Sequence, residues 1–524
     1  MTEQEKDTTR LTIVLWGLLI GLITGAVVSM FRWCIEHALT ATIWAYHQMQ
    51  QGQVVWWLIV IGGSLLIPLI VGLLVKQQPQ ISGSGIPQVE AQLDDELTLS
   101  WWSILWRKFI GGILSIGPGL FLGREGPSIQ LGAAVGQGVA EISGQRGTRR
   151  RVAIACGAAG GLAAAFNAPI AGTLFVLEEV YHNFSPLVWL ASLASAVGAN
   201  LIATTVFGLT PVLHLQYAAS LPVILYGHLV ALGVILGLLG IVYQQALLAM
   251  PQLYQRFIPG PRWLNGVVPF LVTILVGIIV PQWLGGGNAI ILSVGRLSPV
   301  LGTLIILFLV RFCLSMVSYG SGLPGGIFLP ILSLGAIIGG IYAACMIQIG
   351  WLPPKYFVNF VIVAMAGYFA GIGKAPFTAI LLITEMVGTL THLMPLAVVS
   401  LVAYVVVDAL GGAPIYESLR TRLQVPEQQQ AMQGKRAHLE IPVMLGSRLD
   451  NIAVRDFTWP HGTLLVAIRR GERELVPSGD MLIHAGDTLI LTMDQNMRAQ
   501  VRRQLATILA AQSQPTHSTH GDHE

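Results

Sequence analysis

Long apolar stretches alternate with short polar connections through the first four fifths of the chain. Each of the longest stretches carries no charged residue, and about 20 apolar residues suffice to cross a bilayer as a helix. The clearest examples are Leu11–Phe31, Val54–Val75, Val223–Tyr243 and Val267–Leu284. The pattern predicts an all-α polytopic membrane domain at residues 11–417, preceded by a polar cytoplasmic tail at residues 1–10.

The pattern changes after Tyr416. Residues 418–437 are polar and Gln-rich, which is typical of a linker. Short alternating segments separated by glycine-containing turns then predict strands at Leu464–Arg469, Glu474–Pro477 and Thr488–Thr492. We therefore expect a small α+β domain at residues 438–505 and a disordered tail at residues 506–524.

Composition supports the membrane assignment and excludes several classes of function. Hydrophobic residues make up 54% of the 524 residues and charged residues 10%, against about 25% charged in soluble proteins. The net charge of +3 and the lack of a basic patch with interleaved aromatics argue against nucleic-acid binding. The four cysteines lack metal-ligand or disulfide spacing, and no phosphate-binding loop motif occurs. We expect no enzymatic activity, no metal and no cofactor.

One connection is strongly basic. It contains Arg146, Arg149, Arg150 and Arg151. Because cytoplasmic loops carry an excess of arginine and lysine, this connection predicts which side of the membrane domain faces the cytoplasm. The C-terminal domain is expected on the same side.

The membrane domain contains an internal repeat. Pro127–Gly136 matches Pro330–Gly339, and Gly160–Val180 matches Gly367–Val387 at nearly the same offset. Two matches in the same order indicate a duplicated unit. Transporters are often built from such repeats, with the substrate site at the interface and interrupted helices around it.

The repeat separates structural from functional carboxylates. Glu178 has a counterpart in Glu385, which predicts an architectural role for both. Glu179 aligns with Met386, so the fold does not require an acid there. Glu179 is therefore a candidate functional residue. The alternative is that it forms a structural pair with Glu178.

Glu125 is the second acid without a mirror counterpart, because it aligns with Phe328. It lies in an apolar, glycine-rich stretch, where a charge in the membrane costs about 2.5–3.5 kcal/mol or more. A carboxylate retained in such a place predicts a role in transport.

Three segments place glycine and proline directly before an apolar helical stretch. They are Ser82–Pro87, Gly123–Pro127 and Gly325–Pro330. Glycine permits close approach of a ligand to the backbone, and proline is compatible with the first helical turn. Helix N-termini offer free N–H groups and partial positive charge, so three of them together predict an anion site. The alternative is that each segment is only a kink.

These motifs in combination resemble the CLC family of chloride channels and chloride/proton antiporters. Ser82–Pro87 is similar to the family's Gly-Ser-Gly-Ile-Pro signature and Gly123–Pro127 to its Gly-Arg-Glu-Gly-Pro signature. Gly326–Pro330 is similar to its Gly-x-Phe-x-Pro segment, and Gly411–Tyr416 to the stretch with its pore tyrosine. The resemblance implies inverted halves with interrupted helices and a homodimer with one pore per subunit. Because the paired CBS domains of eukaryotic members have no counterpart here, it also implies a bacterial inner membrane.

The resemblance also implies roles for individual residues. Glu125 would be the external gate and proton acceptor, and Glu179 the internal proton-transfer residue. Ser84 and Tyr416 would donate hydroxyl groups to chloride, and Ile327 and Phe328 would donate backbone N–H groups. The remaining residues expected around the anion are Gly85, Ile86, Arg124 and Gly126.

An ionised Glu125 is itself an anion, so it would compete with chloride until it is protonated. This competition predicts exchange of chloride for protons. A passive voltage- or pH-gated chloride channel is the alternative, and an acid at position 179 favours exchange because channel members usually lack it.

The C-terminal segments resemble the C-terminal domain of RCK/TrkA regulators. They are Ala467–Gly471, Val476–Asp480 and Ala485–Leu489. The resemblance implies a compact domain that binds a small regulatory ligand, such as a nucleotide, with Arg469 or Arg470 contacting a phosphate. A solvated hairpin face and simple reinforcement of the dimer are the alternatives. A further alternative for the function is that the whole chain is a ligand-sensing membrane protein regulated through this domain.

Overall fold

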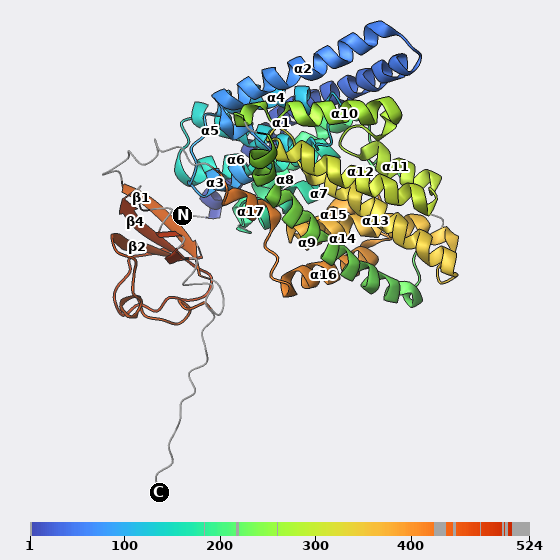
Figure 1. The fold of residues 1–524 in the computed structure, drawn as a ribbon. Coiled ribbons are helices and arrows are strands. Elements are labelled where there is room, and N and C mark those ends of the chain that lie inside the picture. Colours follow the sequence, from blue (N-terminus) through green and yellow to red (C-terminus); the bar gives the residue numbers. More distant parts are fainter. Residues whose placement is uncertain are drawn as a thin grey trace. The chain divides into compact units, whose positions relative to one another are not determined.

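A computed structural model describes most of the chain as two compact units, residues 1–423 and residues 424–524 (Figure 1). The described residues are 3–182, 184–215, 220–258, 260–423, 436–443, 447–471, 473–494, 497, 501–502 and 504–505. Most of the predicted linker and the whole predicted tail at residues 506–524 lie outside them.

The first half of the membrane unit is helical. Its elements are α1 (Glu3–Gln50), α2 (Val54–Gln77), η1 (Pro79–Ile81), α3 (Ile86–Leu93), α4 (Trp101–Ile116), α5 (Glu125–Ile142), α6 (Gly147–Phe166), α7 (Pro169–Phe175), η2 (Val176–Val180) and α8 (Pro186–Phe207). The expected polar tail at residues 1–10 is helical from Glu3, because α1 begins there.

The second half is built from the same kind of elements. They are η3 (Val223–Leu225), α9 (Tyr226–Phe257), η4 (Arg262–Leu264), α10 (Val267–Ile279), η5 (Pro281–Trp283), α11 (Asn288–Leu297), α12 (Leu301–Gly320), α13 (Phe328–Ile349), η6 (Pro354–Tyr356), α14 (Phe357–Gly373), α15 (Pro376–Val387), α16 (Leu393–Ala409) and α17 (Ile415–Arg420). The predicted span Val267–Leu284 is too long, since α10 ends at Ile279, two residues before Pro281. Proline removes a helical hydrogen bond and restricts the residue before it.

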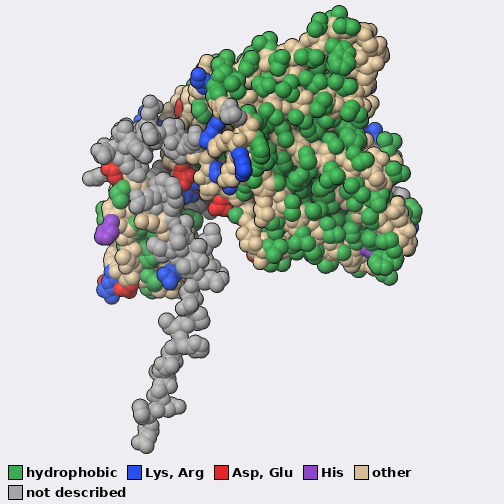
Figure 2. Space-filling model, in the orientation of Figure 1, with side chains coloured by type: hydrophobic (Ala, Val, Ile, Leu, Met, Phe, Trp, Pro, Cys, Tyr) green, Lys and Arg blue, Asp and Glu red, His purple; other side chains and the backbone are tan. Residues whose placement is uncertain are grey.

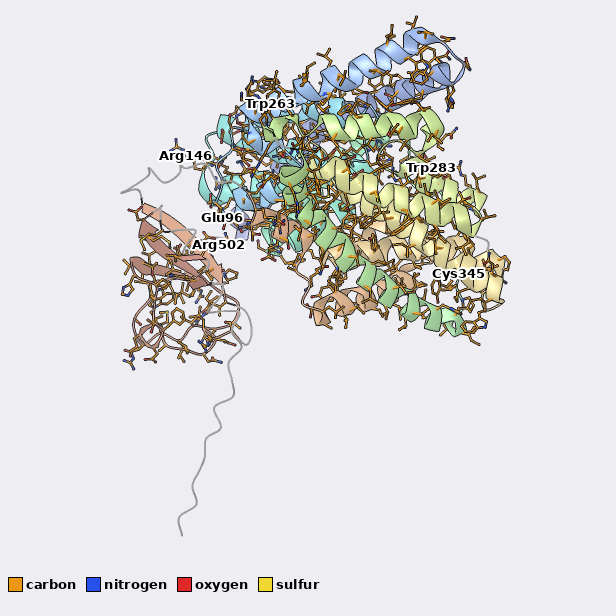
Figure 3. The ribbon with its side chains drawn as sticks, in the orientation of Figure 1. Glu96, Arg146, Trp263, Trp283, Cys345 and Arg502 are labelled. Carbon is orange, nitrogen blue, oxygen red and sulfur yellow. The ribbon has the colours of Figure 1, made fainter. Side chains whose placement is uncertain are left out.

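The surface of this unit suits a bilayer. Eight helices among the described residues are long and apolar enough to cross a membrane, and hydrophobic side chains are spread over the face shown in Figure 2. Figure 3 shows Glu96 and Arg146 on one side of the unit and Trp283 and Cys345 on the opposite side. The basic connection, which contains Arg146, therefore lies on the same side of the unit as Glu96, and its exposure to the cytoplasm stays a prediction.

The repeat is visible as corresponding helices. α5, α6 and α7 of the first half correspond to α13, α14 and α15 of the second, and both α5 with α6 and α13 with α14 pack closely. The halves meet at equivalent residues. Gly123 N–H donates to Gly326 O at 2.7 Å, and Gly326 N–H donates to Gly123 O at 2.6 Å. This reciprocal pair joins the turns that precede α5 and α13.

Glu178 and Glu385 each cap the N-terminus of a helix in the opposite half of the membrane unit. Glu178 accepts hydrogen bonds from Phe377 N–H at 3.3 Å and Thr378 N–H at 2.8 Å, at the start of α15. Glu385 accepts from Ile170 N–H at 3.1 Å and Ala171 N–H at 2.8 Å, at the start of α7. A carboxylate at a helix N-terminus satisfies free N–H groups and complements the helix dipole. The predicted architectural role is confirmed for both residues.

Glu385→Ala is expected to destabilise the protein in detergent. The variant leaves two N–H groups of α7 without their charged acceptor, and hydrogen bonds to charged groups contribute about 1.5–3 kcal/mol each. We expect a clearly lower thermal midpoint, measured by loss of the monodisperse peak on size-exclusion chromatography. Glu141→Ala is the control, because Glu141 is 41% exposed and pairs with Arg150 at the surface, where ion pairs contribute little. Equal midpoints for the two variants would contradict the prediction.

The C-terminal unit contains a four-stranded antiparallel sheet in the order β1-β4-β2-β3. Its elements are β1 (Arg436–Pro442), η8 (Val454–Asp456), β2 (Thr463–Arg470), β3 (Arg473–Leu475) and β4 (Asp487–Asp494). Alternate strand residues such as Leu439, Leu489 and Leu491 form its apolar core. The three predicted strands are confirmed with small shifts of their ends.

Candidate anion and proton site

Three helix starts meet inside the membrane unit. α3, α5 and α13 begin within the three glycine-rich segments, so the prediction that these segments start helices is confirmed. Gly325 N–H donates to Gly83 O at 3.0 Å, which joins the turn before α13 to the turn before α3. Together with the Gly123–Gly326 pair, this bond places the free N–H groups of three helices around one region.

The close approach of these turns requires glycine. A Cβ atom added at Gly126 would lie 2.7 Å from the Cβ of Ser84, which is less than van der Waals contact allows. Gly85, the residue before α3, has φ +92°, a conformation that residues with a side chain rarely adopt. Substitution at either position would separate the helix starts.

The two hydroxyl groups predicted to bind the anion are buried. Ser84 is 1% exposed and Tyr416 is fully buried at the start of α17. The Tyr416 hydroxyl has no hydrogen-bond partner among the described residues. Because a buried donor without an acceptor is costly, an anion that accepts this hydrogen bond fits the site.

Two residues near Ser84 were missed by the sequence reasoning. Tyr319, near the end of α12, interacts with Ser84 through its hydroxyl. Lys108 of α4 is fully buried and its Nζ donates to Ile81 O at 2.8 Å and Gly83 O at 2.7 Å. Lys108 therefore fixes the turn that carries Ser84. Lys108 could have been found from the sequence, because it is a charged residue in an apolar helical stretch, as Glu125 is.

Glu125 is fully buried at the first position of α5. Neither of its carboxylate oxygens forms a hydrogen bond with the described residues, although the backbone N–H groups of Glu125 and Leu329 lie beside it. Arg124 Nε lies 4.0 Å from Glu125 Oε1. The carboxylate thus lies among helix N-termini, where an anion is favoured, and its contacts there are incomplete.

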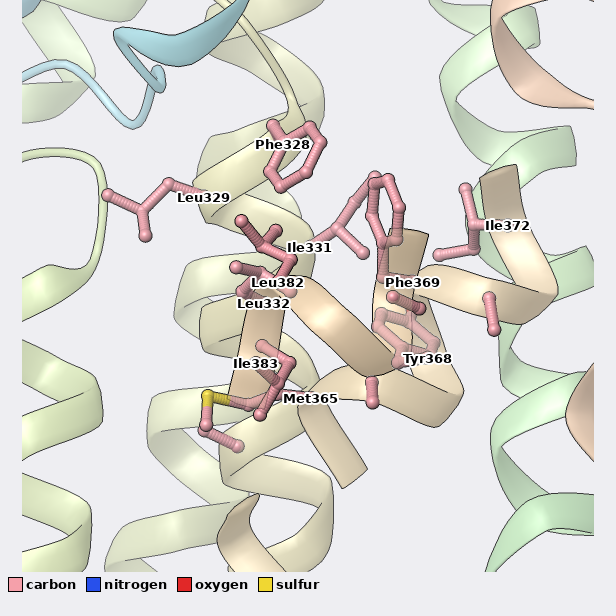
Figure 4. Close-up of a cluster of buried hydrophobic side chains, with 14 of the residues drawn as sticks. Phe328, Leu329, Ile331, Leu332, Met365, Tyr368, Phe369, Ile372, Leu382 and Ile383 are labelled. Atoms are coloured by element: carbon pink, nitrogen blue, oxygen red, sulfur yellow. The ribbon is translucent and has the colours of Figure 1, made fainter. Parts of the chain in front are cut away.

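Aromatic side chains cluster around Phe328, the first residue of α13. Phe328 packs on Phe369 with ring centroids 4.3 Å apart, and on Phe166 at 5.4 Å. Phe175 contacts both Phe328 at 5.8 Å and Tyr416 at 6.2 Å. Figure 4 shows Phe328 at the start of its helix, next to Ile331 and the cluster around Phe369. These rings make the surroundings of the helix starts apolar.

Glu179 lies in η2 and is 5% exposed. Its carboxylate interacts electrostatically with Glu178, Glu417 and Glu90, and with the hydroxyl of Tyr416. Glu178 on the same turn accepts hydrogen bonds from the start of α15. Glu179 instead interacts with Glu417, Glu90 and Tyr416. The structure therefore separates the adjacent glutamates into different surroundings, as the repeat predicts.

Arg469 and Arg470 both form ion pairs inside the C-terminal unit. Arg470 donates to both carboxylate oxygens of Asp487 at 2.8 Å, and Arg469 lies 3.5 Å from Glu440. Burial by itself raises the pKa of Asp487, but the hydrogen bonds from Arg470 and from His484 N–H outweigh it and lower the pKa below its usual value. These pairs favour a structural role for Arg470; contact of either arginine with a regulatory ligand stays a prediction.

Comparisons with known proteins extend over both units. The family model described as voltage gated chloride channel matches residues 67–408, and that of the TrkA-C domain matches residues 438–506. An H(+)/Cl(−) exchange transporter ClcA of Vibrio cholerae is 33% identical over 426 residues, covering 80% of this chain and 91% of the relative. A ClcA of Salmonella arizonae is also 33% identical, covering 80% and 90%.

Solved structures give the same result. A slow cyanobacterial Cl−/H+ antiporter matches with a TM-score of 0.73 and 31% identity, covering 78% of this chain and 97% of the other. A eukaryotic CLC transporter matches with a TM-score of 0.65 and 22% identity, covering 86% and 80%. At 22% identity, the similarity to the eukaryotic transporter supports the fold alone.

Proposed function

The chain belongs to the voltage-gated chloride channel (CLC) family, and on that basis we propose that it exchanges chloride for protons across the membrane. The observation that carries the proposal is the position of Glu125. This fully buried carboxylate lies at the meeting point of three helix N-termini and has no hydrogen-bond partner among the described residues. Similarity to relatives named as H(+)/Cl(−) exchange transporters supports it.

Chloride binds through neutral donors in this mechanism. The hydroxyl groups of Ser84 and Tyr416 and the backbone N–H groups of Ile327 and Phe328 donate to the ion, and the helix dipoles add partial positive charge. Gly85, Ile86, Arg124 and Gly126 shape the site. Because the four donor groups are uncharged, chloride is held strongly enough to enter and weakly enough to leave.

Glu125 links anion movement to proton movement. The ionised carboxylate lies beside the backbone N–H groups of Glu125 and Leu329, where it competes with chloride for the positive ends of the helix dipoles. Protonation removes its charge, so the side chain leaves the site and chloride takes its place. Glu179 supplies the proton from the cytoplasmic side, and the aromatic rings around Phe328 make the surroundings of the helix starts apolar. Each cycle then moves chloride and protons in opposite directions.

The proposal includes an assembly and a location. The protein acts as a homodimer in a bacterial inner membrane, with one pathway per subunit and no cofactor. The TrkA-C domain lies in the cytoplasm and binds a small regulatory ligand. Cross-linking in native membranes tests the dimer, and removal of residues 424–524 tests whether the domain changes the flux.

Purified protein reconstituted into liposomes provides the test of exchange. A chloride gradient without a pH gradient is expected to drive protons uphill, which an external pH electrode records. The reversal potential is expected to shift with the pH gradient. A reversal potential that ignores pH would instead support a passive chloride channel.

A further inference from the structure

Glu36 joins two buried arginines next to Glu125. Arg124 Nη1 lies 2.6 Å from Glu36 Oε1, and Arg32 Nε lies 3.0 Å from the same oxygen. Both arginine side chains are 9% exposed, whereas that of Glu36 is 40% exposed. One carboxylate of α1 therefore balances two guanidinium groups that are almost out of water.

Arg124 lies between two carboxylates, and it contacts only one of them closely. Its Nη1 forms the short bond to Glu36, while its Nε is 4.0 Å from Glu125 Oε1 and has no hydrogen-bond partner among the described residues. The position of this guanidinium relative to Glu125 is thus set by Glu36. Arg32 is held in place as well, through Asn167 Oδ1 at 3.3 Å and the ring of Phe207.

Most other charged or titratable groups on the helices around Glu125 have partners of their own. Arg311 of α12 donates to Gly285 O at 2.7 Å and Gly286 O at 2.8 Å, and Nδ1 of His37 on α1 lies 2.9 Å from Trp33 O. Lys108 of α4 is bonded to the carbonyl groups of Ile81 and Gly83. Glu90 of α3 interacts with Glu179 and Arg420, and the hydroxyl of Tyr416 on α17 interacts with Glu125 itself. The arginines of α6 lie in its first turn, where Arg150 pairs with Glu141 and Arg151 with Asp95. α13 contributes no Asp, Glu, Lys, Arg or His in Phe328–Ile349.

We propose that Glu36 is a positioning residue that sets the pH at which Glu125 takes up its proton. It does so by holding Arg124 away from Glu125 and by neutralising one of the two nearby positive charges. The inference rests on the proposed exchange function and adds to it a residue on α1, outside the glycine-rich motifs that define the site.

Removal of this charge has a predictable direction. In Glu36→Gln, Arg32 and Arg124 remain as two cations beside Glu125, and Arg124 is free to approach the gate. Nearby opposite charges favour the ionised form of a carboxylate. Glu125 then binds its proton only at lower pH, and the pH midpoint of exchange moves downward by about one unit.

The experiment measures the pH dependence of chloride and proton flux in liposomes for the full-length protein and matched variants. Glu36→Gln is expected to shift the midpoint to lower pH with an unchanged ratio of chloride to protons. Glu36→Asp, which keeps the charge, is expected to shift it less. Glu141→Gln is the control, because Glu141 is 41% exposed, also pairs with an arginine, and lies in the last turns of α5.

A second variant separates charge from folding. Arg32→Gln combined with Glu36→Gln removes one cation and one anion, so the midpoint is expected to return toward that of the unmodified protein. A midpoint in Glu36→Gln equal to that of the unmodified protein overturns the inference, as does a double variant that shifts further. Lack of any anion flux in the unmodified protein would overturn the proposed function, and this inference with it.

Discussion

Glu125→Gln is expected to abolish proton transport while chloride transport continues. Glutamine has nearly the same shape and fits the same fully buried position. Its amide neither carries a negative charge nor exchanges a proton at physiological pH, so it does not compete with chloride for the helix N-termini. In liposomes, a chloride gradient should therefore drive no proton movement above that of protein-free vesicles. Chloride efflux, followed with an electrode, should persist and should lose its dependence on pH.

The control for this variant lies on the same helix. Glu141→Gln changes a surface glutamate in the last turns of α5 and is expected to leave both fluxes unchanged. If Glu125→Gln still moved protons against their gradient, the proton would follow another route, and Glu125 would be only an anion competitor. Loss of both fluxes with a normal elution profile would mean that the carboxylate is required for chloride passage itself.

The helix starts could be predicted from the sequence because their signals are local. Glycine and proline in Ser82–Pro87, Gly123–Pro127 and Gly325–Pro330 act within a few residues, and α3, α5 and α13 begin inside these segments. The repeat added information that single motifs lack. It identified Glu178 and Glu385 as equivalent, although it did not show that each caps the helix of the other half.

The parts of the site that escaped prediction depend on contacts between distant segments. Arg32 and Glu36 are four residues apart on one helix, so their pairing follows from helical spacing. The bond from Arg124 to Glu36 does not, because it joins α5 to α1 across 88 positions of sequence. The same holds for Tyr319 beside Ser84. Such contacts are set by helix packing, and a single sequence does not specify them.

Helix ends were less predictable than helix starts. The α10 helix stops at Ile279 although the apolar pattern continues to Leu284, and α9 extends to Phe257, well beyond the apolar span ending at Tyr243. The hydropathy pattern predicts which segments are apolar enough to lie in the membrane. It does not report where packing and proline interrupt the backbone.

Glu179→Gln is expected to preserve chloride transport and to remove its coupling to protons. Glu179 is 5% exposed and interacts electrostatically with Glu417, Glu90 and Tyr416, and it is not one of the groups that donate to the anion in our proposal. Replacing its carboxylate by an amide removes a group that releases and accepts protons without adding bulk. Proton uptake driven by a chloride gradient should fall to background, and the reversal potential should respond to chloride alone.

The adjacent glutamate is the matched control for this variant. Glu178→Gln retains an acceptor oxygen for the start of α15, so coupling is expected to persist even if thermal stability decreases. Loss of coupling in both variants would show that the pair acts through the structure of η2. Retained coupling in Glu179→Gln would return Glu179 to a structural role, although its mirror residue Met386 shows that the fold buries an apolar side chain there without difficulty. Comparing proton coupling in Glu179→Gln and Glu178→Gln therefore tests directly whether protons cross the protein through Glu179.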